Sequence, residues 1–476
     1  MFADEPPSPV EAGEASPFPD GMLFALADAF RGALDSVETG DIILTMVWAL
    51  GDPERRSDLT GAILREDWSA AVEVMTSAWP LDAQPGWTRT LVGSGGREQS
   101  LQAALQSAAA RLGSVILEAE RSGGASGVAC LFSSALEWLS DREGKRGGEF
   151  STPRTVVELV VALVAPRPGE SLFDPFCKSG TLLAGAADAI LVAGQDPPPE
   201  RIAGQTPDTR TWRLADMNLS ARGIRNAVGR RAEDPMRVDL YAGDLFDLVL
   251  CNPPFNVRWP ADPAWSLPQW RYSVPSGKMT NLTWLQLALA KLEVGGRAAV
   301  LLPNNAAVSE NSAERRARLD LLDSDFVECL VALPAQLFPG TAIPVTLWVL
   351  RRGERARAGE VLFVDASELG HMQGRTRRVL RRQDTDRIVA AYRNWSGDAH
   401  RDVVGFTESV AVDRLIEFGG DLSPRAHVRP AGTPTGTRAA ALAVDQQVAR
   451  LQILEERILG LDSEIAGQLA RLTWKP

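Results

Sequence analysis

The sequence predicts an α/β fold with a doubly wound, mostly parallel sheet, joined to a helical N-terminal domain and a C-terminal helix. Short apolar runs typical of buried strands alternate with helical patterns between residues 170 and 364. This alternation indicates a parallel sheet covered on both faces. Before it, from Met22 to about Trp138, apolar residues recur at helical spacing between prolines and glycines. After it, residues 439–476 repeat a helical pattern.

The composition argues against several classes of protein. A chain of 476 residues is long enough for two or three domains. Its apolar runs are too short to span a membrane, and the N-terminus lacks a basic-then-apolar signal, so we expect a cytoplasmic protein without membrane contact. The four cysteines lie far apart and there are only three histidines. This pattern argues against a disulfide framework, a zinc cluster and histidine-based metal sites.

The charge balance is acidic, with a net charge of −11. A protein that binds DNA by itself usually shows a basic face. The balance therefore indicates either that nucleic acid is not the substrate or that a partner supplies much of the electrostatic attraction. It does not exclude a local basic groove.

The N-terminal part of the chain divides into a tail and a helical domain. Residues 1–20 contain five prolines and little to bury, which predicts disorder. Residues 21–144 are predicted to form the helical domain, whose function the composition does not indicate. The polar, glycine-rich stretch Arg142 to Gly148 marks a boundary, and residues 145–429 are predicted to form a second domain.

The second domain opens with two patterns that place polar residues at the ends of elements. Thr152 precedes Pro153, which suits an N-cap followed by proline at the first position of a helix over 156–164. Glu170 to Gly180 then reads as strand, carboxylate, tight turn and helix N-terminus, leading into a helix over 181–191. In a doubly wound fold, ligands bind at the carboxyl ends of the strands.

Further strands and helices follow in order. After a strand and a helix come two closely spaced apolar segments, then a helix and four more strands. Their predicted ranges are 201–205, 209–227, 238–244, 246–251, 281–292, 296–303, 326–333, 343–350 and 360–364.

The stretch 247–255 carries the strongest chemical signal. A short apolar run reads as a buried strand, and four residues follow it directly: Asn252, Pro253, Pro254 and Phe255. Two prolines cannot extend a ladder, so the strand ends in a rigid loop. The loop offers an amide side chain, carbonyl acceptors and an aromatic ring, which together suit a flat ring that bears an amino group. An ordinary proline-rich turn is the alternative for these four residues taken alone.

Two segments near the C-terminus suggest binding surfaces. Residues 371–382 hold five arginines: Arg375, Arg377, Arg378, Arg381 and Arg382. They suit contacts with a DNA backbone, but a solvent-exposed helix start explains them more simply. Residues 430–438 form a Gly/Pro/Thr linker. The amphipathic helix predicted over 439–476 needs a partner surface, either on its own protein or on another subunit.

The order of these motifs resembles the modification-subunit family of type I restriction systems, which are N6-adenine DNA methyltransferases. The resemblance covers roughly residues 145–425, and a run of motifs in one order is highly specific. The matching segments are Glu149-Phe-Ser-Thr-Pro-Arg154, Asp174-Pro-Phe-Cys-Lys-Ser-Gly180, Gly204-Gln205, Met217-Asn-Leu219, Gly223-Ile224, Asn252-Pro-Pro-Phe255, Gly296 to Pro303, Leu333-Pro-Ala-Gln-Leu-Phe-Pro-Gly-Thr341 and Asp421-Leu-Ser-Pro424.

The resemblance implies a class I methyltransferase fold, S-adenosylmethionine as cofactor, and an adenine flipped out of double-stranded DNA. Asn252 and the carbonyl of Pro253 would accept hydrogen bonds from the adenine amino group, Pro254 would complete the catalytic motif, and Phe255 would stack on the base. The residues implied to hold the cofactor are Phe150, Thr152, Asp174, Phe176, Lys178, Ser179, Gly180, Thr206 and Asp244. Asp244 would contact the cofactor adenine, with Asp239 as the other candidate.

Three features depart from the family pattern. Lys178 stands where the family has the first glycine of the cofactor loop, and a side chain there can obstruct the ligand or disfavour a positive φ. Thr206 stands where the family has a glutamate that accepts from the ribose hydroxyls, and a lost charged acceptor costs on the order of 1.5–3 kcal/mol. Gly243-Asp244 runs almost directly into Asp247, where relatives carry a longer insert.

These observations support three hypotheses. The leading one is an N6-adenine DNA methyltransferase that works with a DNA-specificity partner, because the chain is acidic and its C-terminal helix needs a partner. The second is a methyltransferase-fold binding or scaffold subunit with impaired catalysis, because of Lys178 and Thr206. The third is glutamine methylation of a protein, which the helical N-terminus and the downstream motifs disfavour.

Overall fold

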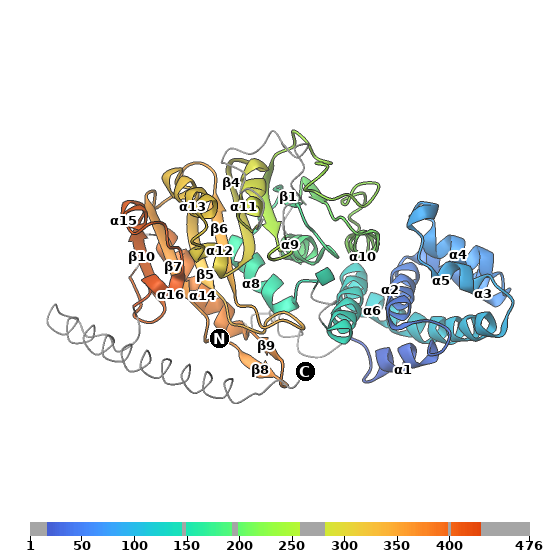
Figure 1. Cartoon of the computed structure of the whole chain (residues 1–476). Helices are drawn as coiled ribbons and strands as arrows, with labels where there is room; N and C mark the ends of the chain where they lie inside the picture. Colours follow the sequence, from blue (N-terminus) through green and yellow to red (C-terminus); the bar gives the residue numbers. More distant parts are fainter. Residues whose placement is uncertain (1–16, 145–148, 193–198, 258–280, 398–400, 430–476) are drawn as a thin grey trace, which may run out of the picture.

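The computed structural model describes residues 17–144, 149–192, 199–257, 281–397 and 401–429. Most of the predicted disordered tail, the linker at 430–438 and the helix at 439–476 lie outside the described residues. Within the described ranges, no helix is both long enough and apolar enough to cross a bilayer. Figure 1 shows a helical lobe beside a lobe built around one large sheet.

The helical lobe forms around α2, which is buried along most of its length. Asp35 caps this helix, because its carboxylate accepts from the backbone N–H groups of Val37 and Glu38. The longest helix, α6, packs against α2 and is interrupted at Gly124, whose φ of 57° and ψ of −141° are not helical. The helices of the lobe are α1 (Met22–Ala29), α2 (Ser36–Gly51), α3 (Pro53–Leu64), α4 (Trp68–Thr76), α5 (Trp87–Leu91) and α6 (Gly96–Glu143), with a short 3-10 helix, η2 (Leu81–Ala83).

The second lobe contains an eight-stranded sheet in the order β10-β7-β5-β6-β4-β3-β1-β2. Strands β2, β1, β3 and β4 are mutually parallel, and β5 is parallel to β7. Strand β6 is antiparallel to both its neighbours, and β10 is antiparallel to β7. The strands are β1 (Ser171–Asp174), β2 (Arg201–Gly204), β3 (Phe246–Cys251), β4 (Leu292–Pro303), β5 (Val327–Ala332), β6 (Val345–Arg351), β7 (Glu360–Asp365) and β10 (Thr407–Ala411). The prediction of a mostly parallel sheet is confirmed.

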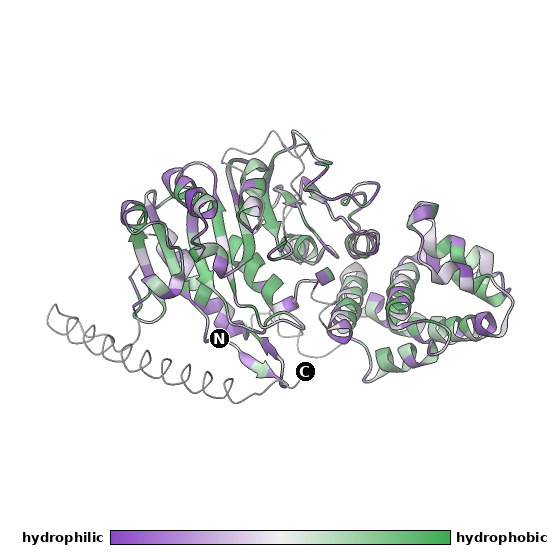
Figure 2. Cartoon of the chain, in the orientation of Figure 1, coloured by the Kyte–Doolittle hydropathy of each residue, from purple (hydrophilic) through white to green (hydrophobic). Residues whose placement is uncertain are grey.

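Helices cover both faces of the sheet because successive side chains of its strands point to opposite sides. In β3, Leu248 and Leu250 join the apolar cluster that contains α8, α9 and α14, whereas Val249 and Cys251 join the cluster that contains α11 and α13. In Figure 2 the strands are largely green, as expected of a sheet buried on both faces. The helices are α8 (Arg154–Val164), α9 (Thr181–Val192), α10 (Thr209–Ser220), α11 (Asn281–Ala290), α12 (Asn305–Val308), α13 (Ser312–Asp323), α14 (Arg382–Ser396), α15 (Val412–Glu417) and α16 (Pro424–His427).

The segment between α10 and β3 corrects two predictions. The helix predicted over 209–227 ends at Ser220, where a turn leads to Gly223 with a φ of 77°. The apolar segment over 238–244 forms turns and not a strand. Its backbone pairs with the side chain of Gln205, which accepts from the N–H of Leu240 and donates to the carbonyl of Val238. These backbone groups therefore bond to a side chain and not to a neighbouring strand.

The arginine-rich segment at residues 371–382 is not mainly a helix start, which was the simpler interpretation of its sequence. Residues 371–379 form an antiparallel hairpin, β8 (His371–Gln373) and β9 (Arg377–Val379), and helix α14 begins only at Arg382. Most of the five arginines therefore lie on a hairpin and not on a helix start. Strand β10 was not predicted; it pairs with β7 at the edge of the sheet.

Candidate active site

The candidate site lies at the carboxyl ends of the parallel strands β1 and β3. These strands are adjacent, with Phe173 opposite Val249 in register. Asp174 is the last residue of β1, and Asn252 follows the last residue of β3. The two polar side chains therefore reach the same edge of the sheet, which is where doubly wound folds bind their ligands.

The loop after β1 is fixed to two other segments by backbone hydrogen bonds and to the side chain of Asp174 at its own start. The N–H of Cys177 donates to the carbonyl of Gln205 at 2.8 Å, and the N–H of Ser179 donates to the carbonyl of Phe150 at 3.0 Å. The N–H of Phe176 donates to the Asp174 carboxylate at 2.9 Å. The loop thus has a defined shape before α9 begins at Thr181.

Lys178 adopts the conformation that a glycine would adopt in this loop. Its φ is 50°, in the left-handed region, and its side chain is buried. Gly180, two residues further on, has a φ of 72°. A residue with a Cβ in this region is strained by about 1–2 kcal/mol. The expected conflict between a side chain and a positive φ is thus present. The backbone hydrogen bonds of Cys177 and Ser179 hold the loop in that conformation.

Asn252 is held by Thr152 and keeps one acceptor unoccupied. Its Nδ2 donates to Oγ1 of Thr152 at 2.9 Å, and both residues are buried. Its Oδ1 is buried as well and has no hydrogen-bond partner among the described residues. A buried polar atom without a partner is unusual in a folded protein and often marks a ligand site.

The structure contradicts the capping role suggested for Thr152. Helix α8 begins at Arg154, and Pro153 takes the N-cap position, from which its carbonyl accepts the N–H of Val157. The N-cap prediction for Thr152 is therefore wrong, because its hydroxyl accepts from the Asn252 amide instead.

The residues after Asn252 form a stiff loop that ends in a packed aromatic ring. Pro253 and Pro254 have no N–H to donate, and Phe255 is half-buried with its ring edge-to-face against Phe338 at 6.2 Å. Phe338 comes from the loop after β5. In the loop after β1, Phe176 packs edge-to-face against Trp284 of α11 at 5.4 Å.

Two buried titratable groups of opposite sign lie in the loop after β1. Burial raises the pKa of Asp174 to about 8, against the opposing effects of the Phe176 N–H and of Lys178. Burial lowers the pKa of Lys178 to about 8, and the Asp174 carboxylate opposes that change. Burial therefore favours the neutral form of both groups. A cation bound beside Asp174 would stabilise the charged form of its carboxylate.

Thr206 is buried at the end of β2 and bonds to a neighbouring helix and loop. Its hydroxyl pairs with that of Thr211 at 2.8 Å, and its carbonyl accepts from the N–H of Glu233 at 2.9 Å. The backbone of Glu233 is thus bonded to the position where the family resemblance implies a glutamate. Glu233 lies 27 residues downstream in another loop, so no local motif or spacing in the sequence could have indicated it.

The structure does not bring Asp244 to this edge of the sheet. Its carboxylate accepts from Nη2 of Arg201 at 2.8 Å, and Arg201 is the first residue of β2, at the opposite end of the sheet from Asp174. The short connection to β3 leaves Asp244 only two residues before that strand begins. The side chain of Asp239, the other candidate, is 8% exposed and accepts from Nζ of Lys291 at 2.6 Å.

The structure does bring the remaining predicted residues to the edge formed by β1, β2 and β3. These are Phe150, Thr152, Asp174, Phe176, Lys178, Ser179, Gly180, Thr206, Asn252, Pro253, Pro254 and Phe255. Their assignment to cofactor and base stays a prediction.

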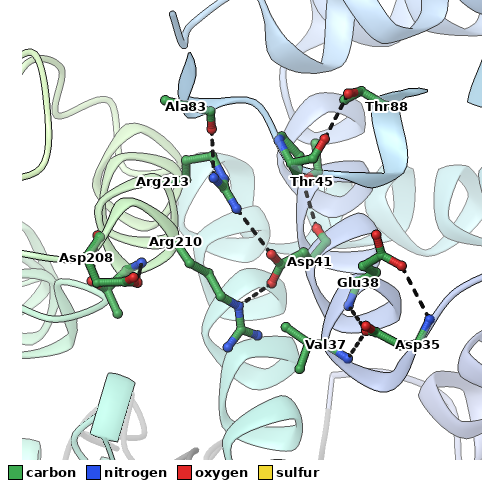
Figure 3. Close-up of polar contacts among 12 residues, drawn as sticks. Asp35, Val37, Glu38, Asp41, Thr45, Ala83, Thr88, Asp208, Arg210 and Arg213 are labelled. Atoms are coloured by element: carbon green, nitrogen blue, oxygen red, sulfur yellow. Dashed lines mark hydrogen bonds and ion pairs between the residues drawn. The ribbon is translucent and has the colours of Figure 1, made fainter. Parts of the chain in front are cut away.

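The helical lobe is attached directly beside this edge, through α10. Figure 3 shows Asp41 of α2 between Arg210 and Arg213 of α10, at 2.7 Å and 3.3 Å. Arg210 also bonds Glu143 at the end of α6, and its guanidinium lies 4.9 Å from the centre of the Phe150 ring. Burial raises the pKa of Asp41, although Arg210 and Arg213 oppose the change. These residues could not be recognised from the sequence, because each looks like an ordinary charged residue on a helix surface.

Known proteins share this fold. The sheet and the helices that cover it form a class I S-adenosylmethionine-dependent methyltransferase fold. The type I restriction-modification methyltransferase subunit from Streptococcus thermophilus superposes on it with a TM-score of 0.65. That structure is 19% identical, and the match covers 85% of this chain and 98% of that chain.

The family follows from the sequence match. The model of the N-6 DNA Methylase family matches residues 130–434, more than half of the chain. The chain belongs to the N-6 DNA methylase family.

Two curated relatives that match part of this chain are methylase subunits of type I restriction enzymes. The type I restriction enzyme HindI methylase subunit of Haemophilus influenzae is 32% identical over 295 residues, which are 62% of this chain and 66% of that protein. The type I restriction enzyme MjaIX methylase subunit of Methanocaldococcus jannaschii is 30% identical over 301 residues, 61% of this chain and 53% of that protein. The match thus spans between half and two thirds of the length of these relatives.

Proposed function

We propose that the chain is a cytoplasmic modification subunit of a restriction-modification system. In this proposal it transfers a methyl group from S-adenosylmethionine to N6 of an adenine in double-stranded DNA and works with a DNA-specificity partner. The proposal depends above all on one observation, the buried Oδ1 of Asn252 that has no partner among the described residues.

Asn252 and its neighbours suit the amino group of an adenine. With Nδ2 bonded to Thr152, the free Oδ1 of Asn252 is oriented as an acceptor, and the carbonyl of Pro253 supplies a second one. Two acceptors on the amino hydrogens would raise the electron density on the amino nitrogen. Phe255, fixed by Phe338, supplies a face for stacking.

The loop after β1 fits the methionine end of S-adenosylmethionine. Asp174 is a buried carboxylate that could accept from the ammonium group. The hydroxyl of Ser179 is also buried and has no hydrogen-bond partner among the described residues. When bound, the cofactor supplies an activated methyl group on a sulfonium, so the protein mainly has to provide proximity and alignment.

We assign the missing ribose contact to Glu233. Its backbone is bonded to Thr206, and a glutamate side chain is long enough to bring its carboxylate beside the Thr206 hydroxyl. Its ion-pair partner, Arg231, is 70% exposed, so this pair is weak and easily exchanged for another contact. Glu233 would thus replace the carboxylate that the family carries at the position of Thr206.

Methyl transfer provides the direct test. Transfer of labelled methyl groups from S-adenosylmethionine to duplex DNA is expected, with and without the products of neighbouring genes. Asn252→Ala should reduce the rate at least about a hundredfold, as loss of a charge-stabilising acceptor does in other enzymes. Asn394→Ala, at an exposed position of α14, is the control and should leave the rate unchanged. Absence of transfer under every combination, or label on protein instead of DNA, contradicts the proposal.

A second candidate function is a scaffold subunit that has lost turnover. Lys178 in the cofactor loop and the neutral Thr206 favour it. Calorimetric titration with S-adenosylmethionine separates the two: micromolar binding supports the enzyme. If binding is absent in the wild type and restored by Lys178→Gly with Thr206→Glu, the scaffold is supported.

The partner surface is proposed from the sequence alone. The helix predicted over 439–476 would bind a specificity subunit or a second copy of the chain. It lies outside the described residues, so the contacts above place no constraint on it.

A further inference from the structure

We propose that Asn281, the first residue of α11, is a positioning residue for the base site. It holds Asn256, the residue that follows Phe255, and thereby fixes where the stacking ring lies. This inference rests on the proposed function, because it assumes that a base binds against Phe255. It gives a role to a residue that lies outside the motifs of the β1–β3 edge.

Asn256 has a backbone conformation that needs support. Its φ is 56°, in the left-handed region, where a residue with a Cβ is strained by about 1–2 kcal/mol. Asparagine enters this region more readily than most residues, but its side chain is exposed here, so burial does not hold it in place. Because Phe255 is its neighbour in the chain, the conformation at Asn256 determines the path of the backbone beyond the ring.

The Asn281 side chain supplies that support with both ends of its amide. Its Oδ1 accepts from the backbone N–H of Asn256 at 3.0 Å, and its Nδ2 donates to Oδ1 of Asn256 at 3.0 Å. Since a backbone N–H can only donate, the oxygen end of the Asn281 amide has to face it. Asn281 is 1% exposed, so its own position is set by the packing of α11 against β3 and β4. Asn281 therefore holds the backbone and the side chain of Asn256 at the same time.

Asn256 is also joined to the end of β4. Nδ2 of Asn305, the first residue of α12, donates to the same Oδ1 of Asn256 at 3.2 Å. The neighbouring Asn304 is fixed in turn, because its Oδ1 accepts from the hydroxyl of the buried Thr346 in β6 at 2.9 Å. Both α11 and α12 pack against β4, as Figure 1 shows. The residue after the stacking ring is thus connected to two other elements of the sheet lobe.

These contacts give the loop after β3 an anchor at each end. Asn252 is bonded where the loop begins, and Asn256 is bonded to Asn281 beyond the ring. Pro253 and Pro254, between these anchors, have no N–H with which the loop could fix itself. A group that contacts a reacting base has to be held within about 0.5 Å of its working position. Bonds at both ends therefore suit a loop that presents a ring at a fixed place.

Hydrogen–deuterium exchange of the free protein tests the contact. Since Pro253 and Pro254 carry no N–H, a peptide over residues 252–257 keeps deuterium at only three backbone amides, one of them that of Asn256. Asn281→Ala removes the acceptor of this amide, which should then exchange about 5-fold to 10-fold faster. Asn281→Asp keeps an acceptor, and the start of a helix favours its negative charge, so exchange should stay close to that of the wild type.

Methyl transfer tests the consequence for the base site. Asn281→Ala should lower kcat about 10-fold to 100-fold, the effect of a small misplacement at a reacting centre. Asn281→Asp should stay within a few-fold of the wild type, and calorimetric binding of S-adenosylmethionine should be unchanged in both variants. Asn311→Ala is the matched control, because it removes an asparagine whose Oδ1 accepts from two backbone N–H groups at the start of α13. It should change neither kcat nor the exchange of the peptide over 252–257.

Asn256→Gly provides a second variant, at an exposed position where folding is not at risk. Glycine adopts a positive φ without strain, but it loses the side-chain bonds to Asn281 and Asn305. The bond from its N–H to Asn281 remains. Exchange should therefore rise, and kcat should fall, by less than in Asn281→Ala.

The outcomes separate this inference from the proposed function. Unchanged exchange in both Asn281→Ala and Asn256→Gly would overturn the inference, and so would a wild-type kcat for Asn281→Ala. An equal effect of Asn311→Ala on the exchange of the peptide also overturns it. If Asn281→Ala does not fold, the exchange of Asn256→Gly decides alone. Absence of methyl transfer by the wild type counts instead against the proposed function, while exchange still decides whether Asn281 holds the loop.

Discussion

At the scale of single residues, the site is organised by the bond between Asn252 and Thr152. Because this bond uses Nδ2, it determines which end of the amide is free. The sequence identified both residues but not their contact, because a threonine before a proline looks like a helix cap. A strand and a loop that lie 100 residues apart have to meet before the actual role becomes visible.

Thr152→Val should therefore reduce methyl transfer, because the Asn252 amide loses its anchor and can rotate. Loss of a buried hydrogen bond costs about 1–3 kcal/mol, so we expect a rate decrease of roughly 5-fold to 150-fold. Thr152→Ser keeps the hydroxyl and should stay within a few-fold of the wild type. Equal rates for the valine and serine variants would show that the bond has no part in catalysis.

Asp174 predicts a pH dependence of stability. Its pKa is raised by burial from 3.8 to about 8 in the folded protein, so the folded state holds a proton that the unfolded chain has lost. Stability is therefore lost as the pH rises from about 4 to about 8. Asp174→Asn has no carboxyl group to titrate, so it does not lose this stability. The free energy of unfolding of the variant, relative to that of the wild type, should therefore increase across that pH range and then level off.

Urea unfolding across this pH range measures the difference. Asp413→Asn, at an exposed position in the first turn of α15, is the control. A gap between Asp174→Asn and the wild type that is the same at low and high pH would contradict the assignment.

At the scale of elements, the segment between α10 and β3 decides how the cofactor would be held. Gln205 draws this segment over the end of β2, and Glu233 thereby reaches Thr206. The sequence correctly predicted most strands, because buried strands leave continuous apolar runs. It failed in this segment, where side-chain contacts with Gln205 replace the regular pattern.

Glu233→Gln should weaken the binding of S-adenosylhomocysteine by roughly 10-fold to 100-fold, the effect of losing a charged acceptor. The 2′,3′-dideoxy analogue, which lacks the ribose hydroxyls, should bind both proteins equally. Arg231→Ala keeps the carboxylate and removes only its exposed partner, so it serves as the matched control. Equal losses for the ligand and its analogue would indicate a structural effect and not a ribose contact.

At the scale of the whole molecule, the two lobes are joined by buried ion pairs between α2 and α10. Asp41 of the helical lobe is buried between Arg210 and Arg213 of the sheet lobe (Figure 3). Both lobes could be predicted from the sequence but their contact could not, because partners 169 and 172 residues apart follow no local pattern. Since Arg210 also lies over Phe150, the interface continues into the candidate site.

Asp41→Ala should destabilise the protein by about 3–5 kcal/mol, because it removes the ion-pair partner of Arg213 and leaves Arg210 with Glu143 alone. Asp28→Ala removes one partner of an exposed ion pair with Arg31 and should cost less than about 1 kcal/mol. Chemical unfolding followed by tryptophan fluorescence measures both. A cost for Asp41→Ala no larger than that for Asp28→Ala would mean that the interface contributes little to folding.

The left-handed backbone at Lys178 has a consequence for redesign of this loop. The hydrogen bonds of Cys177 and Ser179 hold the backbone at a φ of 50°, a conformation that glycine adopts without the strain that a Cβ brings. Lys178→Gly would therefore need no rearrangement of the backbone and would relieve that strain. One substitution is thus enough to change the size and charge of the side chain in this loop without moving its backbone.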